Sequence, residues 1–185
     1  MCFDRALEIN PREAAAWGNK GVALNALGRH QEAIVCFDRA LEINPSEATA
    51  WYNKGLALDA LGRHQEAIVC YDRALGINPR FVWAWGNKGN ALAETGKHQE
   101  AIVCFDRALE INPRDVMSRV NKGISLGKLG KFQEAIACFD RALEINPREA
   151  AAWYNKGLAL KALGRHQEAD ECYDKACSLD NRFCR

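Results

Sequence analysis

The 185-residue sequence lacks the features that mark a membrane protein or a nucleic-acid-binding protein. No apolar run approaches the roughly 18 residues that span a bilayer, and the N-terminus lacks the basic start and apolar middle of a secretory signal. Lys+Arg 25 against Asp+Glu 24 gives a formal net charge of +1, which provides no electrostatic footprint for nucleic acid or anionic lipid. We therefore expect a soluble, cytoplasmic protein with neither nucleic acid nor membrane as a partner.

One stretch, HQEAIVCFDRALEINP, begins at His30 and returns unchanged at His98. Near-copies begin at His64 and Phe132, so the true repeat length is 34 residues. This step defines a partial repeat at residues 1–13 and five complete repeats, at residues 14–47, 48–81, 82–115, 116–149 and 150–183. With 48% hydrophobic and 26% charged residues the composition does not indicate disorder, and we expect one domain over residues 1–185.

Each repeat has the pattern of two amphipathic helices. In the first complete repeat, apolar residues recur three or four apart around Trp17 and again around Phe37. Gly28 lies between the two runs, where a left-handed turn favours a residue without Cβ. Pro45 ends the second helix, because a proline ring disfavours the α conformation in the residue before it.

Gly21 lies inside the first predicted helix, where glycine costs about 1 kcal/mol relative to alanine. Glycine recurs at this place in every complete repeat, at Gly55, Gly89, Gly123 and Gly157. A bare backbone at this place predicts close approach of the second helix, against small residues such as Ala33 and Ala40.

A series of residues at fixed spacing resembles the tetratricopeptide repeat (TPR), a helix-turn-helix unit of 34 residues: Trp17, Gly21, Leu24, Ala33, Phe37, Ala40 and Pro45. The resemblance covers essentially the whole chain. It implies an all-α fold, a right-handed superhelical α-solenoid of stacked antiparallel helix pairs. First helices would line a concave groove, and second helices would form the convex side.

The sequence departs from the family pattern at two places. Arg119 replaces tryptophan in the fourth repeat. Lysine stands where the family usually has an apolar residue, at Lys20, Lys54, Lys88, Lys122 and Lys156. We interpret these lysines as side chains whose apolar stems cover the helix interface. The neighbouring Asp38, Arg39 and Glu42 are interpreted as a solvated helix face with weak ion pairing.

Six of the eight cysteines share one repeat position: Cys2, Cys36, Cys70, Cys104, Cys138 and Cys172. Equivalent places in stacked helix pairs lie more than one packing distance of about 8–10 Å apart, whereas a disulfide needs Cα atoms within about 7 Å. We therefore expect the eight cysteines to be reduced thiols and not a disulfide framework.

Catalytic and metal-binding interpretations find little support. Histidine shares one place in four repeats, but Phe132 fills that place in the other, which indicates packing. His30 and Cys36 are separated by about 240° of helical turn, so they cannot converge as base and nucleophile. No Cys-x-x-Cys pair for zinc occurs, and Cys172, Cys177 and Cys184 are only a loose cluster. We predict no enzyme activity, no catalytic or metal-binding residue, and no cofactor.

Asparagine occupies the sixth place of every complete repeat: Asn19, Asn53, Asn87, Asn121 and Asn155. The resemblance implies that this place faces the groove, where a ladder of amides would hold the backbone of an extended peptide. A carboxamide both donates and accepts hydrogen bonds, so it can match successive peptide groups without selecting a sequence. The alternative is a local hydrogen bond within a helix or turn.

The resemblance places further peptide-binding residues around this ladder: Tyr52, Trp83, Asn90, Met117, Tyr154, Asp59, Glu94, Lys128 and Lys161. The two tyrosines and Trp83 are the expected hot-spot contacts. Acidic groups gather in the earlier repeats and basic groups in the later ones. This order predicts a ligand that is basic toward the second and third repeats and acidic toward the fourth and fifth.

The two ends of the sequence differ. The last second helix carries Asp170, Glu171 and Cys177 at places that are apolar in earlier repeats, which is typical of a terminal cap. Residues 1–10 match a second helix without its first-helix partner, so Phe3 would face an unfilled place. We hypothesise self-association through this N-terminal helix.

The sequence thus predicts a scaffold for protein-protein interaction that binds an extended peptide. One alternative is a structural rod that assembles through the N-terminal helix. Another is redox or metal sensing through the thiol row.

Overall fold

The computed structural model describes residues 10–184, so Phe3 and almost all of the proposed N-terminal helix lie outside the described residues. Residues 10–184 form ten α-helices and one short 3-10 helix, without a β-strand. The chain divides into two compact units, residues 1–95 and 96–185. The division falls between the two helices of the third repeat. Within each unit, helix pairs stack as in an α-solenoid, while one domain over all the repeats stays a prediction.

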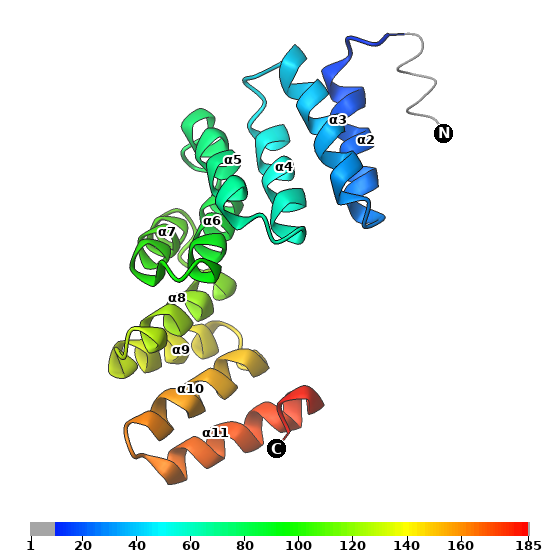
Figure 1. Cartoon of the computed structure of the whole chain (residues 1–185). Helices are drawn as coiled ribbons and strands as arrows, with labels where there is room; N and C mark the ends of the chain where they lie inside the picture. Colours follow the sequence, from blue (N-terminus) through cyan, green and yellow to red (C-terminus); the bar gives the residue numbers. More distant parts are fainter. Residues whose placement is uncertain (1–9, 185) are drawn as a thin grey trace. The chain divides into compact units, whose positions relative to one another are not determined.

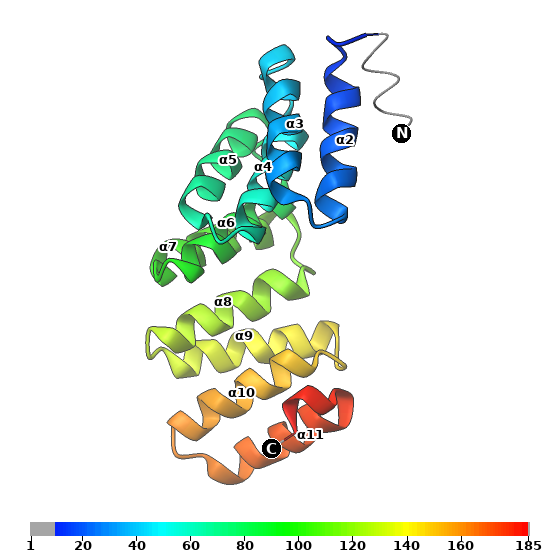
Figure 2. The same cartoon turned by 45° about the vertical axis from the view of Figure 1, so that its right-hand side comes forward.

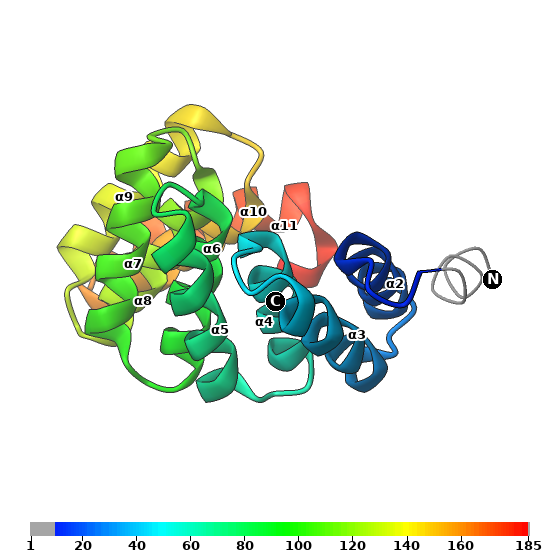
Figure 3. The same cartoon turned by 90° about the horizontal axis from the view of Figure 1, so that it is seen from above.

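The first unit contains two complete helix hairpins and one further helix (Figure 1). Its helices are α2 (Ala14–Ala26), α3 (His30–Ile43), α4 (Ala48–Ala60), α5 (His64–Ile77) and α6 (Val82–Glu94). Helix α2 packs against α3, which contacts α4, and the view from above shows α2 lying beside α3 (Figure 3). Each first helix here begins at the first residue of a 34-residue repeat.

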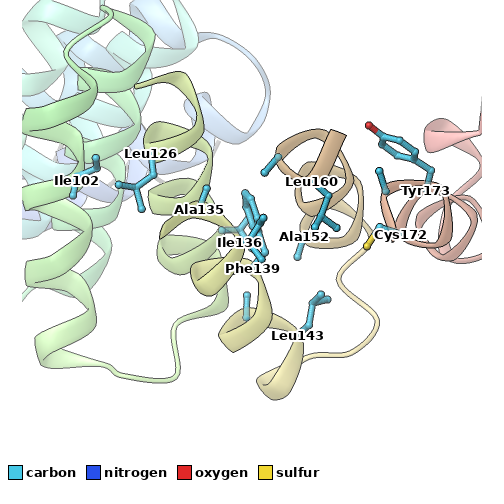
Figure 4. Packing of buried hydrophobic residues seen from close by; sticks show 14 residues of the cluster. Ile102, Leu126, Ala135, Ile136, Phe139, Leu143, Ala152, Leu160, Cys172 and Tyr173 are labelled. Atoms are coloured by element: carbon cyan, nitrogen blue, oxygen red, sulfur yellow. The ribbon is translucent and has the colours of Figure 1, made fainter. Parts of the chain in front are cut away.

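The second unit begins with a second helix and continues with two hairpins (Figure 2). Its helices are α7 (His98–Ile111), α8 (Val116–Lys128), α9 (Phe132–Ile145), α10 (Ala150–Ala162), α11 (His166–Leu179) and the 3-10 helix η1 (Asn181–Phe183). Figure 4 shows Phe139 and Ile136 of α9 facing Leu160 of α10, within one cluster of buried residues. This cluster holds successive repeats of the unit together.

A glycine with positive φ turns the chain between the two helices of each repeat. Gly28 has a φ of 75°, a conformation that residues with a Cβ rarely adopt. The same conformation recurs at Gly62, Gly96, Gly130 and Gly164. The predicted left-handed turn is therefore confirmed.

The glycine inside four of the first helices, α2, α4, α8 and α10, admits an aromatic ring. A Cβ on Gly21 would lie 2.6 Å from Cε1 of Phe37, closer than real side chains approach. The same contact recurs between Gly55 and Tyr71, Gly123 and Phe139, and Gly157 and Tyr173. The expected close approach is confirmed, with the aromatic ring making the nearest contact and, at Gly157, the backbone oxygen of Ala169, the equivalent of Ala33, lying 3.1 Å away. Ala33 and Ala40 are buried, while the nearest atoms belong to the ring.

Polar contacts join each second helix to the next first helix. Lys54 Nζ lies 2.6 Å from Asp38 Oδ1 on α3 and 5.6 Å from the centre of the Trp51 ring. Trp51 Nε1 in turn donates to the carbonyl of Pro45 at 3.0 Å. The ion pair recurs between Lys88 and Asp72, Lys122 and Asp106, and Lys156 and Asp140. These lysines bind the preceding repeat, and Asp38 does not belong to a merely solvated face.

Arg119 keeps one of these contacts although it replaces tryptophan. Its guanidinium donates to the carbonyl of Pro113, six residues earlier, as the indole of Trp51 does to Pro45. The departure from the family pattern therefore preserves the hydrogen bond that anchors the start of the helix.

The described cysteines of the 34-residue row are free thiols, as expected. All of them are buried except the half-buried Cys138. Burial raises the pKa of the Cys70 thiol to about 11, so this thiol stays protonated near neutral pH. Cys2 lies outside the described residues.

The Gly55→Ala substitution should lower the free energy of unfolding by about 1–3 kcal/mol, because the new methyl group would overlap the Tyr71 ring. Gly76→Ala on α5 is the matched control, since a Cβ there would meet no atom within 4 Å. Alanine at Gly76 should be neutral or stabilise the helix by up to about 1 kcal/mol. Urea denaturation of both variants measures the difference, and equal effects would contradict the proposed role of Gly55.

Candidate functional site

The five asparagines of the predicted ladder lie on the first helices. They are Asn19 on α2, Asn53 on α4, Asn87 on α6, Asn121 on α8 and Asn155 on α10. Asn19 is exposed, and the other four are half-buried.

Asn19 and Asn53 line one cavity in the first unit, with a volume of about 670 Å³. This volume is typical of ligand pockets in proteins. Gly18 and the exposed Val22 provide apolar surface around the two amides, whereas Phe37 also lines the cavity but is fully buried. A Cβ on Gly18 would meet no atom within 4 Å, so the space above it is open.

The asparagines differ in the hydrogen bonds of their side chains. Asn87 Nδ2 donates to the hydroxyl of Tyr52 at 3.0 Å. Asn155 Nδ2 donates to the carbonyl of Ala151 at 2.8 Å. This is a local hydrogen bond within α10, as the alternative to a peptide-binding ladder predicts. Among residues 10–184, the side-chain amides of Asn19 and Asn53 have no hydrogen-bond partner.

The residue at the fifth place of the preceding repeat differs among Asn53, Asn87 and Asn155. Tyr52 holds this place and offers a hydroxyl to Asn87, which lies 35 residues later. A glycine or valine offers no side-chain acceptor. The corresponding pairs are Gly18 with Asn53 and Val120 with Asn155.

Aromatic side chains cluster beside Asn87 in the first unit. The Tyr52 ring centre lies 4.8 Å from that of Phe81 and 6.0 Å from that of Tyr71. The Phe81 ring centre lies 6.3 Å from that of Trp83, and 71% of the Trp83 surface is exposed. Burial raises the pKa of Tyr52, although the hydrogen bond from Asn87 partly opposes this change. Trp83 therefore presents the freely accessible part of this cluster.

Asp59 is engaged within its own hairpin. The Tyr71 hydroxyl donates to Asp59 Oδ2 at 2.6 Å, and His64 Nδ1 lies 3.0 Å from Asp59 Oδ1. Burial, followed by this hydrogen bond, raises the pKa of Tyr71. Of the two predicted acidic contacts, Glu94 is the exposed one.

The remaining predicted contacts of the first unit lie on α6. Asn90 Nδ2 donates to Asn87 Oδ1 at 3.5 Å, so the two amides are adjacent. Glu94 is the last residue of the helix.

A smaller cavity of about 220 Å³ lies in the second unit, between α8 and α10. Lys128, Phe132, Asn155 and Leu158 are among its lining residues. Met117 is 59% exposed on α8, and Lys161 is exposed near the end of α10. Asn155 and Lys128 are thus the predicted site residues that the structure brings to one cavity in this unit.

Tyr154 is covered by a residue that follows α11. Its ring centre lies 5.1 Å from that of Phe183 in η1 and 5.6 Å from that of Tyr173. A disulfide joins Cys177 to Cys184 and so brackets η1. The expectation of reduced thiols is wrong for this pair, because Cys177 and Cys184 do not hold equivalent repeat places and their Cα atoms lie only 4.6 Å apart.

Tetratricopeptide-repeat family models match residues 14–47, 48–81, 82–115 and 120–181. The chain belongs to the tetratricopeptide-repeat family. A search of curated proteins gives no match.

Solved TPR structures resemble the chain over most of its length. One of them is the crystal structure of YrrB, a TPR protein with an unusual peptide-binding site. Its sequence is 27% identical to this chain, and the TM-score is 0.81. The match covers 98% of this chain and 93% of YrrB. MamA from Desulfovibrio magneticus RS-1 is 20% identical, with a TM-score of 0.85 and coverage of 91% and 96%. MamA from AMB-1 is 25% identical, with a TM-score of 0.79 and coverage of 89% and 98%.

The TPR repeats carry a signal that the sequence analysis missed. Tyrosine at the fifth and twenty-fourth places occurs together with phenylalanine at the last place, and only in the second and fifth complete repeats. The two sets are Tyr52, Tyr71 and Phe81, and Tyr154, Tyr173 and Phe183. In both sets, the last residue packs on the first, so this combination predicts the aromatic clusters from the sequence.

No helix within residues 10–184 is both long and apolar enough to cross a membrane. The same residues contain no group of three or more His, Cys, Asp or Glu side chains arranged to hold a metal ion.

Reduction of the Cys177–Cys184 disulfide should release Phe183 from Tyr154 and lower the free energy of unfolding by roughly 2 kcal/mol, the contribution of a short closed loop. Cys184→Ser should produce the same loss without reductant and should be insensitive to dithiothreitol. Urea denaturation with and without reductant measures both effects. A wild-type chain that is equally stable in both conditions would contradict this role for the disulfide.

Proposed function

We propose that the chain binds an extended peptide segment of a partner protein along the faces of its first helices that carry the asparagines. The family and the neighbouring structures support a role in protein interaction, and YrrB is a TPR protein with an unusual peptide-binding site. One observation carries the finer proposal. The amides of Asn19 and Asn53 face the same cavity and have no hydrogen-bond partner in the part of the chain that the structure describes.

The cavity suits a peptide because it combines apolar surface with groups that donate and accept hydrogen bonds. A half-buried amide without a partner forfeits a hydrogen bond that water or a ligand can supply. Peptide groups offer both a donor and an acceptor, so each amide can hold one peptide unit. The apolar surface of Gly18 and Val22 would receive side chains of the bound segment.

Exposed apolar and aromatic side chains extend the proposed surface. Trp83 and Met117 are 71% and 59% exposed, and each occupies the second place of its repeat. Large exposed apolar residues of this kind are typical hot spots once a partner excludes water from them. Tyr52 and Tyr154 contribute less accessible ring faces, because Phe81 and Phe183 pack on them.

Binding of this kind needs neither a catalytic residue nor a cofactor, and we propose a scaffold rather than an enzyme. A cytoplasmic location stays a prediction.

Asn19→Ala combined with Asn53→Ala should weaken binding of a peptide selected from a random library by at least about 10-fold, because two peptide groups lose their partners. Isothermal titration calorimetry measures the affinity, and circular dichroism checks that helix content is unchanged. Gln65→Ala, which removes an exposed carboxamide from the second helix α5, is the matched control. Equal affinity of the double variant and wild type would remove the asparagines from the binding site.

Charge should set the direction of the bound peptide. The first unit offers Glu94 and the second offers Lys128 and Lys161, all exposed. A selected peptide should therefore carry basic residues toward the earlier repeats and acidic residues toward the later ones. Exchanging the two ends should weaken binding at low salt by about 3- to 10-fold and have less effect at high salt. Unchanged affinity at low salt would refute this charge order.

A further inference from the structure

We infer that the cavity over Gly18 binds a tyrosine side chain of the partner peptide, with the Asn53 amide donating to its phenol oxygen. This inference rests on the proposed peptide-binding function and names the side chain that the cavity selects.

The next repeat contains the arrangement that such a ligand would form. Tyr52 projects from the fifth place of its repeat, and its hydroxyl accepts a hydrogen bond from Asn87 Nδ2 at 3.0 Å. The Tyr52 ring lies 6.0 Å from the ring of Tyr71, which comes from the second helix of the same hairpin. A phenol thus fits between a first-helix asparagine and a second-helix ring.

The first repeat contains the same surroundings without the phenol. Gly18 takes the place of Tyr52, Asn53 that of Asn87, and Phe37 that of Tyr71, each exactly one repeat length of 34 residues earlier. Gly18, Phe37 and Asn53 all line the cavity of about 670 Å³. Apart from Gly18's chain neighbours and the backbone of its own helix, nothing lies within 4 Å of the point where a side chain at Gly18 would begin. The first repeat therefore has room for the ring that its own sequence does not supply.

Asn53 lacks the partner that its counterpart has. Among the described residues its amide forms no hydrogen bond, and Gly18, at the place of Tyr52, offers no hydroxyl to it. Where the fourth repeat also offers no hydroxyl, the asparagine amide bonds within its own helix. Val120 fills the fifth place there, and Asn155 turns its amide to the Ala151 carbonyl of its own helix. Asn53 makes no such bond, so its donor remains available for a ligand.

One neighbour of Tyr52 in the second repeat has a different counterpart in the first repeat. Phe81 packs on Tyr52, whereas Glu47 occupies the matching place and accepts a hydrogen bond from the Thr49 amide at 3.4 Å. Both Glu47 and Thr49 line the cavity. The bound ring would therefore lie beside the exposed Val22 side chain and the bare backbone of Gly18, and meet a polar rim on the other side, which suits a phenol better than an unsubstituted phenyl ring.

The test compares N-acetyl-tyrosinamide with N-acetyl-phenylalaninamide, titrated into the full chain and followed by NMR. Wild type should bind the tyrosine compound about 3- to 10-fold more tightly, which is the effect of one neutral hydrogen bond. Asn53→Ala should reduce this ratio to about 1. Gly18→Tyr should fill the cavity from within and weaken binding of both compounds at least about 10-fold.

Matched controls separate the cavity from general effects of the substitutions. Gly76→Tyr introduces the same residue at an open position of α5, and Gln65→Ala removes a carboxamide from the same helix. Both should leave the tyrosine preference unchanged. Gly18→Val, which copies the residue of the fourth repeat, tests filling of the cavity with a smaller side chain and should also weaken binding.

Several results would overturn the inference. For wild type, these are equal binding of the two compounds or no binding of either. For the variants, they are a tyrosine preference that survives Asn53→Ala, or binding that is not weakened in folded Gly18→Tyr and Gly18→Val variants. If selected peptides still require Asn19 and Asn53 in such a case, the peptide-binding function stands and only the tyrosine site fails.

Discussion

Four helix hairpins, α2–α3, α4–α5, α8–α9 and α10–α11, depend on contact between an aromatic ring of the second helix and the bare backbone of the first. Phe37 lies so close to Gly21 that a single methyl group would not fit between them, and three other hairpins repeat this contact. Together with the positive-φ glycine of the turn, it gives the hairpins one geometry. Residues at the same place in different repeats therefore have similar surroundings. Differences in side-chain contacts between repeats therefore come from the residues that change, and not from the backbone of the hairpins.

The asparagine at the sixth place illustrates this principle. Its position on the first helix is constant, but its hydrogen bond differs from repeat to repeat. A tyrosine at the fifth place of the preceding repeat engages Asn87, whereas Asn155, with a valine at that place, bonds with its own helix. Glycine leaves Asn53 beside an open cavity without a partner among the described residues. One invariant residue thus has a structural role in some repeats, while in another it is available to a ligand.

Local signals made most of the fold predictable from the sequence. The 34-residue step, the turn glycines and the helix-ending prolines act within a few residues of chain, and the helices follow them closely. Contacts between repeats were less predictable, because they depend on packing. The Lys54–Asp38 pair joins residues 16 apart on different helices, and Phe183 reaches Tyr154 only because the chain turns after α11. The predicted site residues lie on the first helices, but spacing alone could not distinguish Asn87 from Asn53. To distinguish them, one must also know which residue lies 35 positions earlier, because that residue contacts the asparagine.

The most direct measurement of the central claim is an NMR titration of the chain's side-chain amides with a peptide selected for binding. The account predicts that the Asn19 and Asn53 side-chain resonances shift most, while those of Gln31 and Gln65 on the second helices stay unchanged. Larger shifts at the second-helix glutamines, with Asn19 and Asn53 unaffected, would contradict it.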